Sequence, residues 1–127
     1  MYKRITPILI VHAIEPVLPL WEALGFQRGP SVPHGDRLGF QILEADGIEV
    51  MYQTVESVQA DAPRVLDSPA PLRSAIYIEV DDLDAVERRL PPDTPVIVER
   101  RTTPYGAKEL SVLDAAGNVI GFAQFGG

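Results

Sequence analysis

The 127-residue sequence contains no cysteine and only two histidines, His12 and His34. The absence of cysteine excludes disulfide bridges, thiolate zinc sites, iron–sulfur clusters and a cysteine nucleophile. Any metal ion would therefore need carboxylates and at most two imidazoles as ligands. His12 ends the first predicted strand and His34 lies in a Pro-His-Gly-Asp turn, so we expect both to be structural or surface residues.

Basic residues are also few. The chain has 11 Lys and Arg against 18 Asp and Glu, a formal net charge of −7. A negative surface repels phosphate backbones, which argues against a nucleic acid partner, and it weakly favours cationic ligands. No apolar run approaches the roughly 20 residues that a membrane-spanning helix needs. The apolar run Ile8–Val11 is too short for a secretion signal. We therefore expect a single-domain cytoplasmic protein with no membrane partner.

The order of predicted elements in the first half is strand, helix, strand, strand, strand. The first strand covers residues 5–11, and a helix runs from Glu15 to a stop at Gly25. A weak strand covers residues 26–32, followed by a turn at the prolines and glycine of residues 30–35. Strands 37–43 and 48–54 flank Asp-Gly, a strong hairpin signal. Residues 55–72, with Pro63, Pro69 and Pro71, are predicted to be a linker with at most one turn of helix.

The second half repeats this order. Its predicted elements are a strand over 74–80, a helix over 82–90 capped by Asp82, and strands over 95–102, 108–113 and 118–124. Matching positions in the two halves lie 69 or 70 residues apart. This internal repeat predicts an α+β fold of two βαβββ modules, about 4–54 and 73–125. Paired, they would form one curved, mostly antiparallel eight-stranded sheet, with helices on the convex side and a cleft on the concave side. A ferredoxin-like fold would need a helix after residue 90.

Three stretches make the sequence resemble the vicinal oxygen chelate superfamily, especially its glyoxalase/bleomycin-resistance branch. They are the opening strand and helix from Pro7 to the Leu-Gly-Phe at residues 24–26, the strand Gly47–Gln53, and the segment from Thr103 to Asn118 with its Asp-Ala-Ala-Gly-Asn turn. The Val-Asp-Asp-Leu-Asp segment at residues 80–84 also fits. The resemblance covers nearly the whole chain.

Metal-dependent members of that superfamily take one ligand from each of four strands. Carried over by the resemblance, these positions hold Thr6, Glu49, Ala75 and Gly121. Only Glu49 is a usual metal ligand, whereas a divalent ion in an enzyme site needs three or four. We therefore expect neither a metal nor another cofactor.

The candidate ligand-binding residues are predicted from strand alternation and turn position. Glu49, Met51 and Gln53 alternate on one strand face, and Tyr77 shares a face with Ala75. The full candidate set is Phe40, Glu49, Met51, Gln53, Tyr77 and Tyr105. Glu49 is interpreted either as an acceptor or general base facing a ligand, or as an acid paired with an arginine of the opposite sheet. Each aromatic candidate could equally be a core residue. Trp21, Phe26, Phe122 and Phe125 are assigned to the core or an interface.

The resemblance implies a small-molecule-binding protein that sequesters its ligand, a cationic one being favoured, and that forms a homodimer. The resemblance does not decide whether the protein is an enzyme, but the missing metal ligands favour ligand binding without catalysis. The alternative is a metal-dependent lyase or isomerase with non-standard ligands, and a third hypothesis is a module that serves a protein partner and has no ligand of its own.

Overall fold

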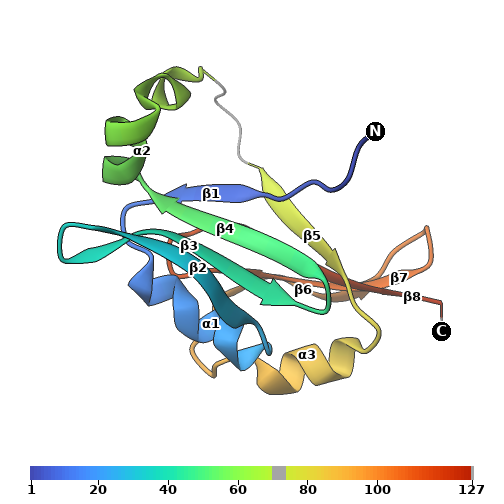
Figure 1. Cartoon of the computed structure of the whole chain (residues 1–127). Helices are drawn as coiled ribbons and strands as arrows, with labels where there is room; N and C mark the ends of the chain where they lie inside the picture. Colours follow the sequence, from blue (N-terminus) through green and yellow to red (C-terminus); the bar gives the residue numbers. More distant parts are fainter. Residues whose placement is uncertain (70–73, 127) are drawn as a thin grey trace. The chain divides into compact units, whose positions relative to one another are not determined.

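The computed structural model describes residues 1–69 and 74–126, in two compact units, Met1–Pro71 and Leu72–Gly127. Each unit has the element order of one predicted module, so the α+β class and the two βαβββ modules are confirmed (Figure 1). The strands form two four-stranded sheets, one in each unit. The predicted end of the linker, residues 70–72, and the start of the second module at residue 73 lie outside the described residues.

The first sheet has the strand order β1-β4-β3-β2. Only the β1–β4 pair is parallel, and the other pairs are antiparallel. The elements of unit 1 are β1 (Ile8–Val11), the 3₁₀ helix η1 (Glu15–Val17), α1 (Leu18–Ala23), β2 (Gln27–His34), β3 (Arg37–Ala45), β4 (Ile48–Thr54), α2 (Val55–Asp61) and the 3₁₀ helix η2 (Pro63–Asp67). The Asp46-Gly47 hairpin turn is confirmed, with a positive φ at both residues.

Three predictions for unit 1 were wrong in detail. β1 is shorter than expected, because Ile5 lies before it and is exposed. Pro30 and Pro33 lie inside β2 instead of a turn; β2 is an edge strand with register shifts, where a missing N–H is tolerated. The predicted linker forms α2 and η2, because the Thr54 hydroxyl caps α2 by accepting from the Ser57 N–H at 3.1 Å.

The core of unit 1 lies between α1 and one face of the sheet. Trp21 of α1 is fully buried, and its Nε1 donates to the Tyr52 hydroxyl of β4 at 2.8 Å. Gln41 is buried in β3 and donates to the carbonyls of Gly29 and Ile42 at 3.0 and 2.8 Å, which ties down the irregular edge strand. Glu15 accepts from the Leu38 N–H at 2.8 Å, and this bond holds the pKa of Glu15 below its ordinary value.

The second sheet has the strand order β5-β8-β7-β6, with β5–β8 parallel and the other pairs antiparallel. The elements of unit 2 are β5 (Ala75–Glu79), α3 (Leu83–Arg89), β6 (Val96–Thr102), β7 (Ala107–Leu113) and β8 (Val119–Phe125). Each lies within about two residues of its predicted range.

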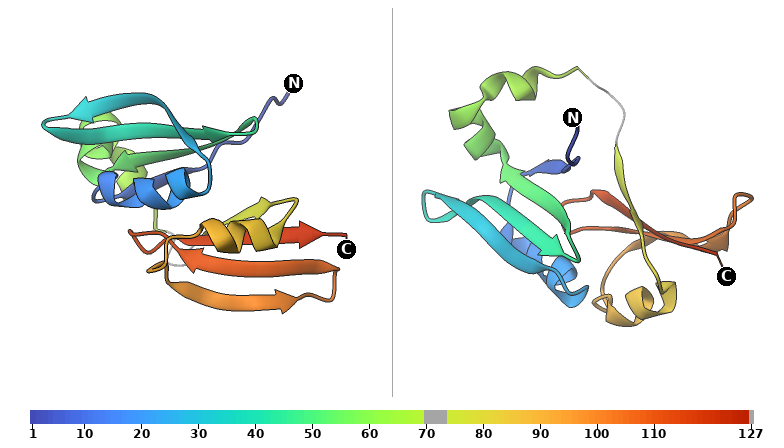
Figure 2. Two further views of the ribbon diagram at one scale, coloured as in Figure 1. Left: turned by 90° about the horizontal axis from the view of Figure 1, so that it is seen from below. Right: turned by 45° about the vertical axis from the view of Figure 1, so that its right-hand side comes forward.

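Within unit 1, α1 packs on one face of the sheet and α2 contacts β1, β3 and β4, whereas within unit 2 the helix α3 packs on one face of its sheet (Figure 2). In unit 2, Leu83 of α3 is fully buried against β7 and β8. Asp82 caps α3 by accepting from the Ala85 N–H at 3.2 Å, as predicted, and Gln124 of β8 accepts from the Leu83 N–H at 2.8 Å. Among the described residues, no helix has the length and apolar character needed to cross a membrane.

Candidate functional site

The sheet of unit 1 has a face opposite α1, and α2 contacts this face where Gln53 donates to Ser57. Because Tyr52 contacts α1, its neighbours Met51 and Gln53 in β4 lie on the opposite face. Strand register places Phe40 beside Gln53 and Glu44 beside Glu49 on that same face. We call this the unit 1 face, formed by Ile8, Ile10, Phe40, Ile42, Glu44, Glu49, Met51 and Gln53. The four predicted site residues of the first module are therefore brought together.

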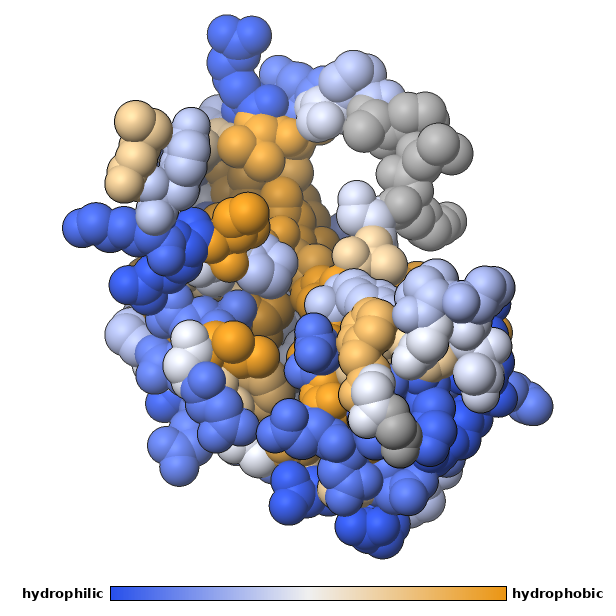
Figure 3. All heavy atoms as spheres, turned by 90° about the vertical axis from the view of Figure 1, so that its right-hand side faces the viewer, coloured by the Kyte–Doolittle hydropathy of each residue, from blue (hydrophilic) through white to orange (hydrophobic). Residues whose placement is uncertain are grey.

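The unit 1 face is apolar along its middle and partly open to solvent. Ile8 and Ile10 of β1 are exposed although they are large apolar side chains, and Ile8 pairs in register with Met51. Figure 3 shows hydrophobic side chains forming part of the molecular surface, flanked by hydrophilic ones. An exposed apolar sheet face with a polar border is typical of binding surfaces.

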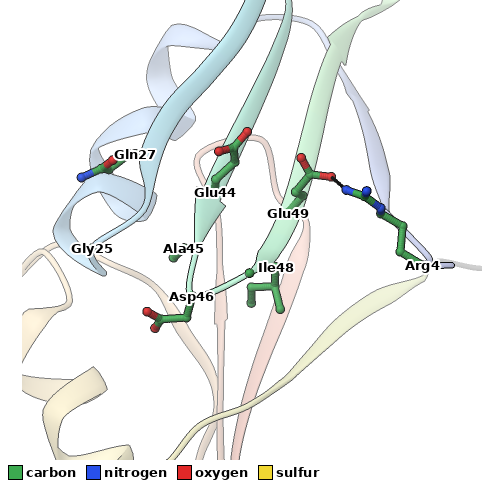
Figure 4. Close-up of a pocket in the computed structure, with 9 residues that line it drawn as sticks. Arg4, Gly25, Gln27, Glu44, Ala45, Asp46, Ile48 and Glu49 are labelled. Atoms are coloured by element: carbon green, nitrogen blue, oxygen red, sulfur yellow. Dashed lines mark hydrogen bonds and ion pairs between the residues drawn. The ribbon is translucent and has the colours of Figure 1, made fainter.

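Glu49 lies at the polar end of this face, beside a cavity of about 480 Å³. In Figure 4, Glu44 and Glu49 extend from adjacent strands toward the same side, and Arg4 reaches Glu49. A second cavity of about 420 Å³ is lined by Thr6 and Glu49, among other residues. Phe40, Met51 and Gln53 line neither cavity. Of the four predicted residues in unit 1, Glu49 is therefore the one that both lies on the unit 1 face and lines a cavity.

Two of the predicted polar residues have partners within unit 1. The Arg4 guanidinium pairs with Glu49 at 3.2 Å, so the predicted ion pair exists. The arginine, however, comes from the segment before β1 and not from the opposite sheet. Gln53 Nε2 donates to the Ser57 hydroxyl of α2 at 3.1 Å. Glu49 can still accept hydrogen bonds from a ligand, because Arg4 occupies only one of its oxygens.

Unit 2 contains a second constellation on the sheet face away from α3. Both predicted tyrosines, Tyr77 of β5 and Tyr105 of the β6–β7 turn, donate their hydroxyls to the same oxygen, Glu109 Oε2. The Tyr105 bond is 2.6 Å long. Arg101 of β6 donates to the other oxygen, Oε1, at 3.2 Å. We call Tyr77, Tyr105, Arg101 and Glu109 the tyrosine–glutamate cluster.

The Tyr77 ring of the cluster lies beside a glycine in the strand between its members. Tyr77 lies on β5 and Glu109 on β7, with β8 between them. Gly121 of β8 pairs in register with Tyr77, and a Cβ placed on it would lie 3.6 Å from the Tyr77 ring and 3.2 Å from Ser111 Oγ. The missing side chain leaves room for the Tyr77 ring to cross β8 and reach Glu109.

Burial differs sharply within the cluster. Glu109 is only 5% exposed, whereas Tyr77 and Tyr105 are 54% and 61% exposed. Hydrogen bonds from Tyr105 and Tyr77, with a contribution from Arg101, hold the pKa of Glu109 below its ordinary value. The same carboxylate raises the pKa of Tyr77 well above its ordinary range. The buried, ionised carboxylate of Glu109 thus holds the rings of Tyr77 and Tyr105 in place while both rings remain exposed to solvent.

The sequence analysis missed Glu109, Arg101 and the role of Phe125. Glu109 alternates with Ser111 on β7 and lies opposite Ala123, so the strand parity used for Tyr77 could have placed it on this face. Phe125, which was assigned to the core or an interface, is not in the core, because it is exposed, and its ring lies 6.3 Å from that of Tyr105. Trp21 and Phe122 are in the core as predicted.

The raised pKa of Tyr77 gives a testable prediction. In an absorbance titration, we expect Tyr77→Phe to remove a tyrosine that ionises well above pH 10, and Glu109→Gln to return that tyrosine toward the ordinary value of about 10. While Glu109 is ionised, the stability from the Tyr77–Glu109 bond is complete up to the unfolded-state tyrosine pKa, about 10, and is lost as the pH rises through the raised folded-state pKa. Tyr2→Phe, at an exposed residue, is the control. If Tyr77→Phe removes a tyrosine of ordinary pKa, the Tyr77–Glu109 bond is absent in solution.

The residues at the four metal positions do not fit a divalent ion. Ala75 and Gly121 carry no donor atom, and Glu49 is paired with Arg4. Within residues 1–69 and 74–126, no three His, Asp or Glu side chains are grouped closely enough to hold a metal ion. His12 and His34 are exposed, in agreement with the sequence analysis.

Comparison with known proteins gives similarity at the level of structure. No family model matches the sequence, and no curated protein matches it significantly. TioX from Micromonospora sp. ML1 has a TM-score of 0.74 at 15% identity, over 97% of this chain and 98% of that chain. Lactoylglutathione lyase from Agrobacterium tumefaciens has a TM-score of 0.73 at 16% identity, over 98% and 95%.

A third similar structure is TnmS3 from Streptomyces sp. CB03234, described as an antibiotic binding protein. It has a TM-score of 0.65 at 22% identity, over 99% of both chains. Glyoxalase/bleomycin resistance/dioxygenase structures from Nocardioides and Burkholderia phytofirmans are also similar. The chain therefore has the glyoxalase/bleomycin resistance fold, as the sequence predicted.

Proposed function

We propose that the protein binds and sequesters a small molecule without a metal ion and without converting it. The observation that carries this proposal is the pair of sheet faces opposite α1 and α3, each of which exposes apolar or aromatic side chains beside a few polar groups. Ligand sites combine these features, because apolar walls supply affinity and a few polar groups fix orientation. The similarity to an antibiotic binding protein supports it.

Binding is tested by calorimetric titration with a panel of cationic glycopeptide antibiotics and metabolites. For a ligand that binds, we expect Phe40→Ala and Met51→Ala to weaken the affinity by about tenfold each, since losing a buried side-chain contact costs roughly 1.5 kcal/mol. Val65→Ala, at an exposed apolar residue of η2, is the matched control. No heat with any member of the panel contradicts the proposal, and unchanged affinity in both variants removes the unit 1 face from it.

The alternative function is a metal-dependent lyase or isomerase with non-standard ligands, which the similarity to lactoylglutathione lyase favours. The missing donors at Ala75 and Gly121 argue against it. Elemental analysis of protein purified without chelators separates the two. Stoichiometric metal that is lost in Glu49→Ala would replace the binding proposal with the alternative.

We further propose that the protein acts as a homodimer in the cytoplasm, with no nucleic acid or membrane partner. The negative charge supports the exclusion of nucleic acid. Light scattering after size-exclusion chromatography checks the assembly. Twice the mass of one chain is the expected result.

A further inference from the structure

The tyrosine–glutamate cluster fixes the direction of its hydrogen bonds. A phenol has one hydrogen to donate, and both Tyr77 and Tyr105 direct theirs to Glu109 Oε2. An ionised carboxylate has no hydrogen to give in return. The two phenol oxygens are therefore left with lone pairs only, so toward solvent or a ligand they act as acceptors.

The direction of these two hydrogen bonds is difficult to reverse, because their acceptor, the Glu109 carboxylate, is buried. Glu109 is 5% exposed, so water cannot readily replace either phenol. Hydrogen bonds to a charged acceptor are also about twice as strong as neutral ones. Turning a phenol outward to donate to a ligand would leave a buried carboxylate oxygen with one partner fewer, at a cost that a single new hydrogen bond does not recover.

The rings around these oxygens provide a flat aromatic surface. Tyr77 and Tyr105 are mostly exposed, and Phe125 lies beside Tyr105 with its ring tilted by 33°. The faces of such rings attract cations and stack with planar groups. Two charged side chains lie nearby on the same face. Arg101 is paired with Glu109, and Glu79 of β5 is exposed.

We propose that Glu109 is a positioning residue that makes this surface selective for planar ligands carrying hydrogen-bond donors, such as aryl amidines, and selective against planar carboxylates. An amidinium group can donate to the phenol oxygens while its ring stacks on the aromatic side chains. A carboxylate finds no donor on the tyrosines, and Arg101 is already engaged. This inference rests on the proposed function and specifies the ligand class of one of its surfaces.

The test uses two probes with the same ring and opposite polarity, 2-naphthamidine and 2-naphthoate. Each is titrated into the full chain carrying ¹³C-labelled tyrosine, and binding is followed by the ring signals of Tyr77 and Tyr105 in NMR spectra. We expect naphthamidine to bind at least about tenfold more tightly, a difference of roughly 1.4 kcal/mol. The signal of Tyr52 should stay unchanged, because this residue is fully buried in the core of unit 1.

Glu109→Gln is the decisive variant. A carboxamide can donate to one phenol oxygen, which frees that phenol to donate outward, so the preference should fall to about threefold or less. Glu79→Gln removes the same charge from the same face without touching a phenol and should keep the preference. Should Glu109→Gln fail to fold, Tyr105→Phe supplies the second variant, which should weaken naphthamidine binding and leave naphthoate binding unchanged.

Several results would overturn the inference. They are equal or tighter binding of naphthoate, an equal loss of preference in Glu79→Gln, and probe binding that leaves the Tyr77 and Tyr105 signals unchanged. If neither probe binds while a ligand of the calorimetric panel does, the selectivity is overturned and the binding function stands. If the panel also fails, the proposed function itself is wrong.

Discussion

Trp21→Ala is expected to lower the free energy of unfolding by about 3–5 kcal/mol. Trp21 is the only tryptophan, and it is completely buried between α1 and the first sheet. Its ring lies edge-on to Phe26 at 4.9 Å and to Tyr52 at 6.3 Å. Truncation to alanine would remove this packing and leave a cavity that a short helix cannot fill by moving. The substitution is the most damaging single change that we expect in unit 1.

The measurement is urea unfolding followed by circular dichroism, since the variant has no tryptophan fluorescence. Trp21→Phe separates packing from hydrogen bonding. It keeps an aromatic ring but removes the bond from Nε1 to the Tyr52 hydroxyl, and should cost less than the alanine variant. A loss below about 1 kcal/mol in Trp21→Ala would show that α1 is not the core element described here, because typical core truncations cost more.

Asp114→Ala should lower the free energy of unfolding by about 2–4 kcal/mol, because it removes two charged hydrogen bonds to backbone donors. Asp114 begins the turn between β7 and β8 and is 3% exposed. Its Oδ1 accepts from the N–H groups of Ala116 and Asn118 at 2.9 and 2.8 Å, and Oδ2 accepts from Asn118 Nδ2 at 3.0 Å. Without the carboxylate, the turn would keep its backbone bonds from the Asp114 N–H to Asn118 O and from the Gly117 N–H to Asp114 O, but it would lose the side-chain bonds that reinforce the β7–β8 register.

Asn118→Ala is the matched control, since it removes only the side-chain bond and should cost clearly less than Asp114→Ala. Trp21 fluorescence adds a second readout, because it reports on unit 1 while the substitution is in unit 2. The single domain predicted from the sequence requires fluorescence and circular dichroism to shift together. Separate transitions would mean that the two units unfold independently. Equal stability of Asp114→Ala and the unmodified chain would contradict the turn assignment.

The sequence predicted the fold well where local chemistry is decisive. Asp46-Gly47 predicted the β3–β4 hairpin because both residues tolerate a positive φ, and both adopt one. Asp82 predicted the start of α3 because its side chain satisfies a free N–H, as the structure shows. Repetition of the order strand, helix, strand, strand, strand in both halves then identified the two modules. Such signals need only a few neighbouring residues.

The errors arose where distant residues decide the structure. Pro30 and Pro33 favour a turn locally, yet they are accommodated in β2 because that strand is at the sheet edge and because Gln41 holds its irregular backbone. Edge position is a property of the assembled sheet. Glu109 was overlooked for the same reason. It gains its role from Tyr77, 32 residues away in sequence, across an intervening strand.

The candidate site was predicted in part. Strand alternation placed Glu49, Met51 and Gln53 on one face, as the structure has them, and one of the two interpretations of Glu49 gave it an arginine partner, although from the opposite sheet. Parity cannot show that Gln53 is engaged by Ser57, because that contact depends on how α2 leaves β4. Strand geometry predicts the directions of these side chains. It does not predict which groups the side chains contact.

The glycine at position 121 also limits which side chains β8 can carry beside Tyr77. The superfamily resemblance would place a metal ligand there, but a Cβ at that position would lie 3.2 Å from Ser111 Oγ and against the Tyr77 ring. Gly121→Glu would therefore displace the tyrosine before it offered a carboxylate to a metal. A metal-ligating side chain at position 121 and the present position of the Tyr77 ring therefore exclude each other.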